Sequence, residues 1–176
     1  MDYITIATIG MGVLIAKKIF NSPKNMYGVD ALSYYETVQA YYNKVKKYNN
    51  SQLKDVTILA MIYQESAGDP RAVGDGGKSL GLMQLQEGAW IDSGISLMGA
   101  SYNKENAFNP DLNISAGIGY INFIDRKLDK DDDAIIMSYN IGIGNYTKNK
   151  KLDVGSQYLQ GVRKHEKELK NHILGY

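Results

Sequence analysis

The chain has 176 residues, a net charge of +1 and 44% hydrophobic residues, a composition that suits one domain with a sizeable core. Its lysines and arginines form no long run, so the sequence does not favour nucleic-acid binding. It contains no cysteine, which excludes a disulfide framework and thiolate metal sites. We therefore expect a fold stabilised by packing, with no metal and no cofactor.

An apolar segment occupies residues 4–16 and is followed by Lys17 and Lys18. A membrane span normally requires roughly 20 apolar residues, so this segment is short unless the lysines snorkel to the membrane surface. It lacks the positive start and the small-residue cleavage site of a secretory signal. We expect residues 1–22 to form a retained hydrophobic anchor helix, with a buried core helix as the alternative, and residues 23–176 to form the remaining domain.

Residues 29–49 have the periodicity of an amphipathic helix, with Asp30 as its expected N-cap. Its tyrosines, among them Tyr42 and Tyr48, recur near one face of this helix. Tyrosines at such spacing are more often packing residues than the wall of a sugar groove, so we expect this face to be buried.

Glu65 follows a run of apolar residues at helical spacing, and the helix is expected to stop at Gly68-Asp69-Pro70. A carboxyl held against apolar side chains loses solvation of its charged form, which raises its pKa and suits a general acid. The alternative is a solvated acid at the end of a helix. The glycine-rich loop that follows is not a phosphate loop, because Ala72 stands where that motif requires glycine.

Residues 86–108 are expected to be irregular, with Trp90 in the core. Asn109-Pro110 then starts a helix with a long apolar face. Glycine inside a helix is unfavourable by roughly 1 kcal/mol, so Gly117 and Gly119 predict the close approach of another segment.

The acidic cluster at residues 129–133 is expected to cap the next helix. It does not match a calcium loop, because the glycine and the closing glutamate of that motif are absent. The C-terminal helix is rich in mixed charge, and His165 and His172 are expected on its surface.

Three motifs in order resemble those of the lytic transglycosylases, which belong to the goose-type lysozyme superfamily. The first is Glu65-Ser66, Pro70 and Gly81-Leu82-Met83-Gln84; the second is Asn109-Pro110-x-x-Asn113-Ile114-x-x-Gly117-x-x-Tyr120-Ile121; the third is Ser138-Tyr139-Asn140-x-Gly142. The resemblance spans residues 56 to about 162. It implies a mainly α, lysozyme-like transglycosylase domain, here preceded by the short hydrophobic N-terminal helix.

The resemblance also implies a reaction, the cleavage of the β-1,4 bond between N-acetylmuramic acid and N-acetylglucosamine in peptidoglycan. Glu65 would protonate the leaving oxygen and then act as base while the muramic 6-hydroxyl attacks, which gives a 1,6-anhydro product. Substrate-binding residues carried over by motif are Gln84, Met83 and Tyr139, with Asn140, Ser66, Ser79 and Tyr158 as weaker candidates. The Pro-x-Glu-Thr that typically precedes the late tyrosine is missing, so the role of Tyr158 stays open.

Two alternatives to a transglycosylase remain open at the level of sequence. A lysozyme that uses water ordinarily needs a second carboxylate, for which Asp69, Asp75 and Glu87 are available. A non-catalytic wall-binding or structural virion protein would keep only the fold. The presence of Glu65, Gln84 and Tyr139 argues against loss of activity.

The charges around the apolar segment predict where the domain lies. Positive residues tend to stay on the cytoplasmic side, and Lys17, Lys18 and Lys24 follow the segment. That orientation leaves the domain inside the cell, away from the wall. A membrane-containing phage particle or a lysis system would resolve the conflict, so we expect a membrane-associated protein of a virion membrane or a bacterial cell envelope. The oligomeric state is not predicted.

Overall fold

The computed structural model describes residues 36–173, and their side chains up to residue 171. The elements are α2 (Tyr42–Tyr48), α3 (Asp55–Ser66), β1 (Val73–Gly74), η1 (Asp75–Gly77), β2 (Ser79–Leu80), α4 (Glu87–Asp92), η2 (Ile95–Met98), α5 (Lys104–Ala107), α6 (Pro110–Leu128), α7 (Asp132–Ile141), α8 (Ile143–Thr147) and α9 (Leu152–Ile173). The mainly α prediction is confirmed. The two short strands form an antiparallel hairpin in which Val73 pairs with Leu80 and Gly74 pairs with Ser79.

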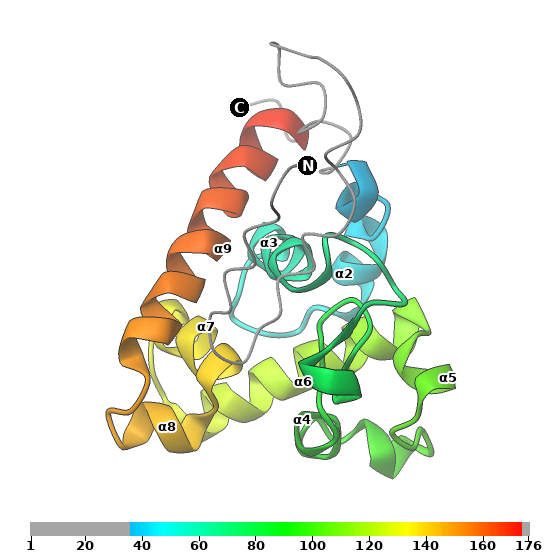
Figure 1. The fold of residues 1–176 in the computed structure, drawn as a ribbon. Helices are drawn as coiled ribbons and strands as arrows, with labels where there is room; N and C mark the ends of the chain where they lie inside the picture. The colour runs from blue at the N-terminus through cyan, green and yellow to red at the C-terminus, as the bar shows by residue number, and fades with distance from the viewer. Residues whose placement is uncertain (1–35, 174–176) are drawn as a thin grey trace, which may run out of the picture.

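Helix α3 lies at the centre of the molecule, with the long helix α9 along one side and α6 crossing below it (Figure 1). Helix α3 packs against α9 and α2, and α7 packs against both α9 and α6. The sequence predicted one buried face for α3, but every residue from 56 to 62 is buried. A helix that neighbours enclose on several sides has no solvated face, so its apolar residues need not follow one stripe.

The described part of the predicted helix 29–49 is broken, because residues 36–39 are helical, residues 40–41 form a turn and α2 begins at Tyr42. Its apolar residues pack as expected, with Val38 and Val45 fully buried. Asp111 ties α2 to α6 by accepting hydrogen bonds from Lys44 Nζ and from Tyr48 Oη at 2.9 Å.

Helix α6 begins as the sequence predicted, with Asn109 as N-cap and Pro110 in the first turn. The close approaches at its glycines are confirmed, because a Cβ at Gly117 would collide with the side chain of Met83 and one at Gly119 would meet Ser93. Trp90 is fully buried, as expected, and its ring nitrogen donates to the carbonyl of Ala100 at 2.8 Å.

Asp131 caps α7 by accepting a hydrogen bond from the Ala134 N–H, which confirms the capping interpretation. The prediction for His165 is wrong. Its ring is half-buried and packs edge-on against Tyr63, with ring centroids 4.5 Å apart. This happens because α9 lies against α3, which brings the histidine face of the helix onto the tyrosine.

The predicted anchor helix at residues 1–22 and the expected N-cap Asp30 lie outside the described residues, as does the side chain of His172. Between residues 36 and 173, none of the helices is sufficiently long and apolar to cross a membrane.

Candidate active site

Glu65 lies in the last turn of α3, and the end of this helix is held firmly. Ser66 Oγ donates to the Ile62 carbonyl at 3.1 Å and accepts from the Gly68 N–H at 3.2 Å. Ala67 and Gly68 then take left-handed backbone conformations, with φ of 52° and 80°. Tyr41 Oη adds a hydrogen bond of 3.3 Å to the Gly68 carbonyl. The buried hydroxyl of Ser66, a predicted substrate-binding residue, is therefore engaged in ending the helix.

The carboxyl of Glu65 meets a residue from the far end of the chain. Tyr158, on α9, donates a hydrogen bond from its hydroxyl to Glu65 Oε1 at 2.7 Å. Burial raises the pKa of Glu65 to about 7, partly offset by the Tyr158 hydrogen bond and reinforced by the charge of Asp75. Near neutral pH the acid is thus available in both protonation states, which a group that donates and later accepts a proton requires.

Asp75 is the one of the three candidate second acids whose charge acts on Glu65. It begins η1 in the loop between the two strands, with a left-handed φ of 50°. Its Oδ2 accepts hydrogen bonds from Ser79 Oγ at 2.7 Å and from Gln86 Nε2 at 2.9 Å. Ser79, a predicted substrate-binding residue, is therefore buried and oriented towards Asp75.

The Gly81-Leu82-Met83-Gln84 segment forms a tight turn beside the hairpin, and its side chains point inward. The side chain of Met83 is fully buried against Gly117. Gln84 is partly exposed, but its Nε2 donates to the Gly81 carbonyl at 2.8 Å and to the Ala72 carbonyl at 3.1 Å. The donor half of this amide is thus used to hold the turn.

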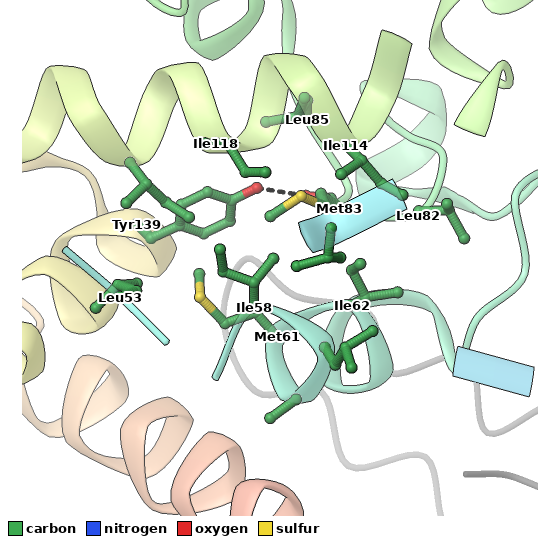
Figure 2. Close-up of a cluster of buried hydrophobic side chains, with 14 of the residues drawn as sticks. Leu53, Ile58, Met61, Ile62, Leu82, Met83, Leu85, Ile114, Ile118 and Tyr139 are labelled. Carbon is green, nitrogen blue, oxygen red and sulfur yellow. Dashed lines mark hydrogen bonds between the residues drawn. The ribbon is translucent and has the colours of Figure 1, made fainter. Parts of the chain in front are cut away.

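Tyr139 is buried, and its hydroxyl donates to the carbonyl of Met83 at 2.8 Å (Figure 2). Burial raises the pKa of Tyr139 well above its usual value, and the charge of Glu65 contributes, which places the two residues within electrostatic reach. The ring of Tyr120 packs against it, with centroids 5.5 Å apart. Next in the chain, the Oδ1 atom of Asn140 is buried and accepts no hydrogen bond from the described residues.

The structure therefore brings Tyr158 of α9 into contact with Glu65 of α3, and Tyr139 of α7 and Asp75 of the hairpin loop lie within electrostatic range of this carboxyl. The sequence analysis gave Tyr158 only as a weaker candidate for substrate binding. The feature of the sequence that could have indicated its position is Gly161, three residues later on the same helix. A Cβ at Gly161 would meet the side-chain amide of Gln64, so this glycine lies where α9 faces α3. Across residues 36–171, no three His, Asp or Glu side chains are grouped so that they could hold a metal ion.

Comparison with known protein families assigns the chain to one of them. The profile of the family described as the transglycosylase SLT domain matches residues 42–160, and the chain belongs to this family. Its fold is the lysozyme-like SLT fold. No curated protein sequence matches the chain.

Solved structures with the same fold include three structures of lytic transglycosylases. The 70 kDa soluble lytic transglycosylase from Escherichia coli is 17% identical, with a TM-score of 0.65 over 82% of this chain and 29% of that one. In its complex with bulgecin A, the identity is 18% and the TM-score is 0.57, over 83% of this chain and 28% of that one. An inactive mutant of the lytic transglycosylase Slt from Pseudomonas aeruginosa is 23% identical, with a TM-score of 0.61 over 76% of this chain and 24% of that one. The chain thus spans less than a third of the length of each of these three solved chains.

Proposed function

We propose that this chain is a peptidoglycan lytic transglycosylase in which Glu65 is the catalytic acid and base. The observation that carries the proposal is Glu65, a half-buried residue whose carboxyl has a pKa raised to about 7 by burial and accepts a hydrogen bond from the hydroxyl of Tyr158. Membership of the SLT family supports the same substrate, a glycan strand of the bacterial wall.

The proposed reaction has two proton transfers at Glu65. The protonated carboxyl first donates its proton to the glycosidic oxygen as the bond from this oxygen to C1 of N-acetylmuramic acid breaks. The carboxylate then accepts the proton of the muramic 6-hydroxyl while that oxygen bonds to C1, which closes the 1,6-anhydro ring and restores the acid. Because Tyr158 holds Oε1 at 2.7 Å, the other oxygen, Oε2, is the one we assign to proton transfer.

Asn140 is our first candidate for substrate binding. Its buried Oδ1 lacks a partner among the described residues, and a buried acceptor without a donor is unfavourable by roughly 1–3 kcal/mol. The N–H of an N-acetyl group would satisfy it. Gln84, Ser66, Ser79 and Met83 remain predictions as substrate residues.

Mass spectrometry of peptidoglycan fragments released by the full-length protein tests the activity. We expect fragments that end in 1,6-anhydromuramic acid, and none from the Glu65→Gln variant, whose amide keeps the shape but cannot donate the proton. The variant must remain folded by circular dichroism. Release of fragments by folded Glu65→Gln at the rate of the parent would show that Glu65 is not the acid.

A hydrolytic muramidase is the second candidate, and Asp75 favours it. This carboxylate is oriented by Ser79 and Gln86 and acts electrostatically on Glu65, as a second acid that activates water would do. A hydrolase leaves reducing ends, which are heavier by one water than anhydro ends. Reducing ends alone, lost in Asp75→Asn, would move the protein to this class.

For location, we propose that residues 1–22 anchor the protein to a membrane, in a virion that carries its own wall-cutting enzyme or in a bacterial envelope. The support is the apolar segment at residues 4–16 and the lysines after it. Fractionation of the full chain against a chain that starts at Asn25 tests this. A full-length protein that stays in the soluble fraction would contradict the anchor.

A further inference from the structure

The turn formed by residues 81–84 is held by one fully buried side chain, that of Asn113 on α6. Asn113 Oδ1 accepts a hydrogen bond from the Met83 N–H at 2.8 Å. Its Nδ2 donates to the Ala107 carbonyl at 2.8 Å and to the Leu80 carbonyl at 3.1 Å. Both amide hydrogens and the amide oxygen are therefore used, each on a backbone group.

The conformation of this turn requires such support. Gly81 has a φ of 76°, and a Cβ there would collide with the Ala107 carbonyl and the Asn113 amide. Gln84 is not a glycine and yet has a φ of 46°. A left-handed backbone at such a residue is unfavourable and persists only where the surroundings determine it. Asn113 supplies the hydrogen bonds in the middle of this turn.

Hydrogen bonds connect the 81–84 turn to the surroundings of Glu65. The carbonyl of Met83 accepts from the Tyr139 hydroxyl (Figure 2), and its N–H donates to Asn113. The backbone of Met83 is therefore held by α6 through its N–H and by α7 through its C=O. Tyr139 lies within electrostatic reach of Glu65. Gln84 Nε2 and the Gly81 N–H both bind the Ala72 carbonyl, at 3.1 and 2.9 Å, which joins the turn to the segment after α3.

We propose that Asn113 is a positioning residue for the reaction, one that sets where the 81–84 turn and Tyr139 lie relative to Glu65. The inference rests on the function proposed above. Asn113 is fully buried and touches no substrate itself. It acts through the Met83 backbone, and its loss would let the turn relax away from its left-handed conformation.

The first test is the rate of glycan cleavage by Asn113→Ala in the full chain, with kcat and KM measured on soluble glycan strands. Misplacement by about 1 Å lowers a rate about 100-fold, so we expect kcat to fall by that order while KM changes by about threefold or less. The matched control is Ile124→Ala, a truncation of another fully buried side chain on α6. It should lower the melting temperature comparably and leave kcat within about twofold of the parent.

The second test replaces Asn113 by aspartate, which has nearly the same shape but carries a titratable carboxyl in place of the donating amide. In Asn113→Asp, the protonated carboxyl still accepts from the Met83 N–H and donates one hydrogen bond, whereas the ionised form sets a negative charge against the Leu80 and Ala107 carbonyls. Burial and these carbonyls raise the pKa of the introduced carboxyl in the folded protein. Its favourable form is therefore present at low pH and is lost as pH rises through that raised pKa.

We expect the ratio of Asn113→Asp activity to parent activity, measured at each pH, to rise as pH falls. Because Glu65 titrates in both proteins, its titration cancels in this ratio. If Asn113 served stability alone, the ratio per folded molecule would not change with pH. A ratio that is flat with pH, inactivity at every pH, or an Asn113→Ala variant that matches Ile124→Ala in kcat would overturn the inference. An inactive parent would instead contradict the proposed function.

Discussion

The raised pKa of Glu65 has a consequence for stability that can be measured without substrate. An ordinary glutamate has a pKa of 4.5, whereas burial raises that of Glu65 to about 7 in the folded protein. The unfolded chain then ionises Glu65 more readily than the folded one. Its stabilising contribution is complete below pH 4.5 and is lost as pH rises through about 7.

The Glu65→Gln variant removes this titration, because an amide does not ionise. One pKa unit corresponds to about 1.4 kcal/mol, so the shift from 4.5 to about 7 amounts to at most about 3.5 kcal/mol at alkaline pH. Glu65 is partly exposed, and solvent screening lowers this figure, so we expect the variant to gain about 1–3 kcal/mol over the parent between acid and alkaline pH. For a chain of this size, that is a melting-temperature gain of several degrees, about 2–4 °C per kcal/mol.

Thermal unfolding followed by circular dichroism, from about pH 4 to about pH 9, measures this difference. The amide itself is expected to shift the melting temperature by a constant amount at every pH. Only the change of the difference between variant and parent with pH reports the titration of Glu65. Glu87→Gln removes one negative charge from an exposed site and serves as control. If the curves for parent and Glu65→Gln stay parallel over the whole range, Glu65 is not a desolvated acid, and the physical basis of its role is refuted.

Three further variants test the surroundings of the acid. Tyr158→Phe removes a hydrogen bond that lowers the pKa of Glu65, so the alkaline limb of the pH–activity profile should move up by about 1–2 pH units, and an unmoved limb would contradict this contact. Asp75→Asn removes a charge that raises the same pKa, so that limb should move down, and product analysis of the same variant separates lyase from hydrolase. Gly117→Ala places a Cβ against Met83 and should lower stability by about 1–3 kcal/mol in denaturant unfolding, whereas Gly144→Ala, which meets nothing within 4 Å, should not.

The sequence by itself determined the local features of this protein. Its helical class follows from apolar periodicity, and the start of α6 at Asn109-Pro110 and the cap at Asp131 follow from capping chemistry. The close approaches at Gly117 and Gly119 follow from the unfavourable free energy of glycine inside a helix. The motif around Glu65 predicted a general acid there, and the apolar helix before it predicted a carboxyl with reduced solvation.

Only the tertiary structure decided which groups surround that acid. Tyr158 is 93 residues away from Glu65 in the chain, and their contact exists because α9 packs on α3. The same packing half-buries His165, while the turn geometry directs Met83 and Gln84 inward. Helical periodicity shows which face of a helix is apolar but not which helix covers it. The pKa of Glu65 depends on that cover, because desolvation and hydrogen bonding are properties of the assembled neighbours rather than of the local chain.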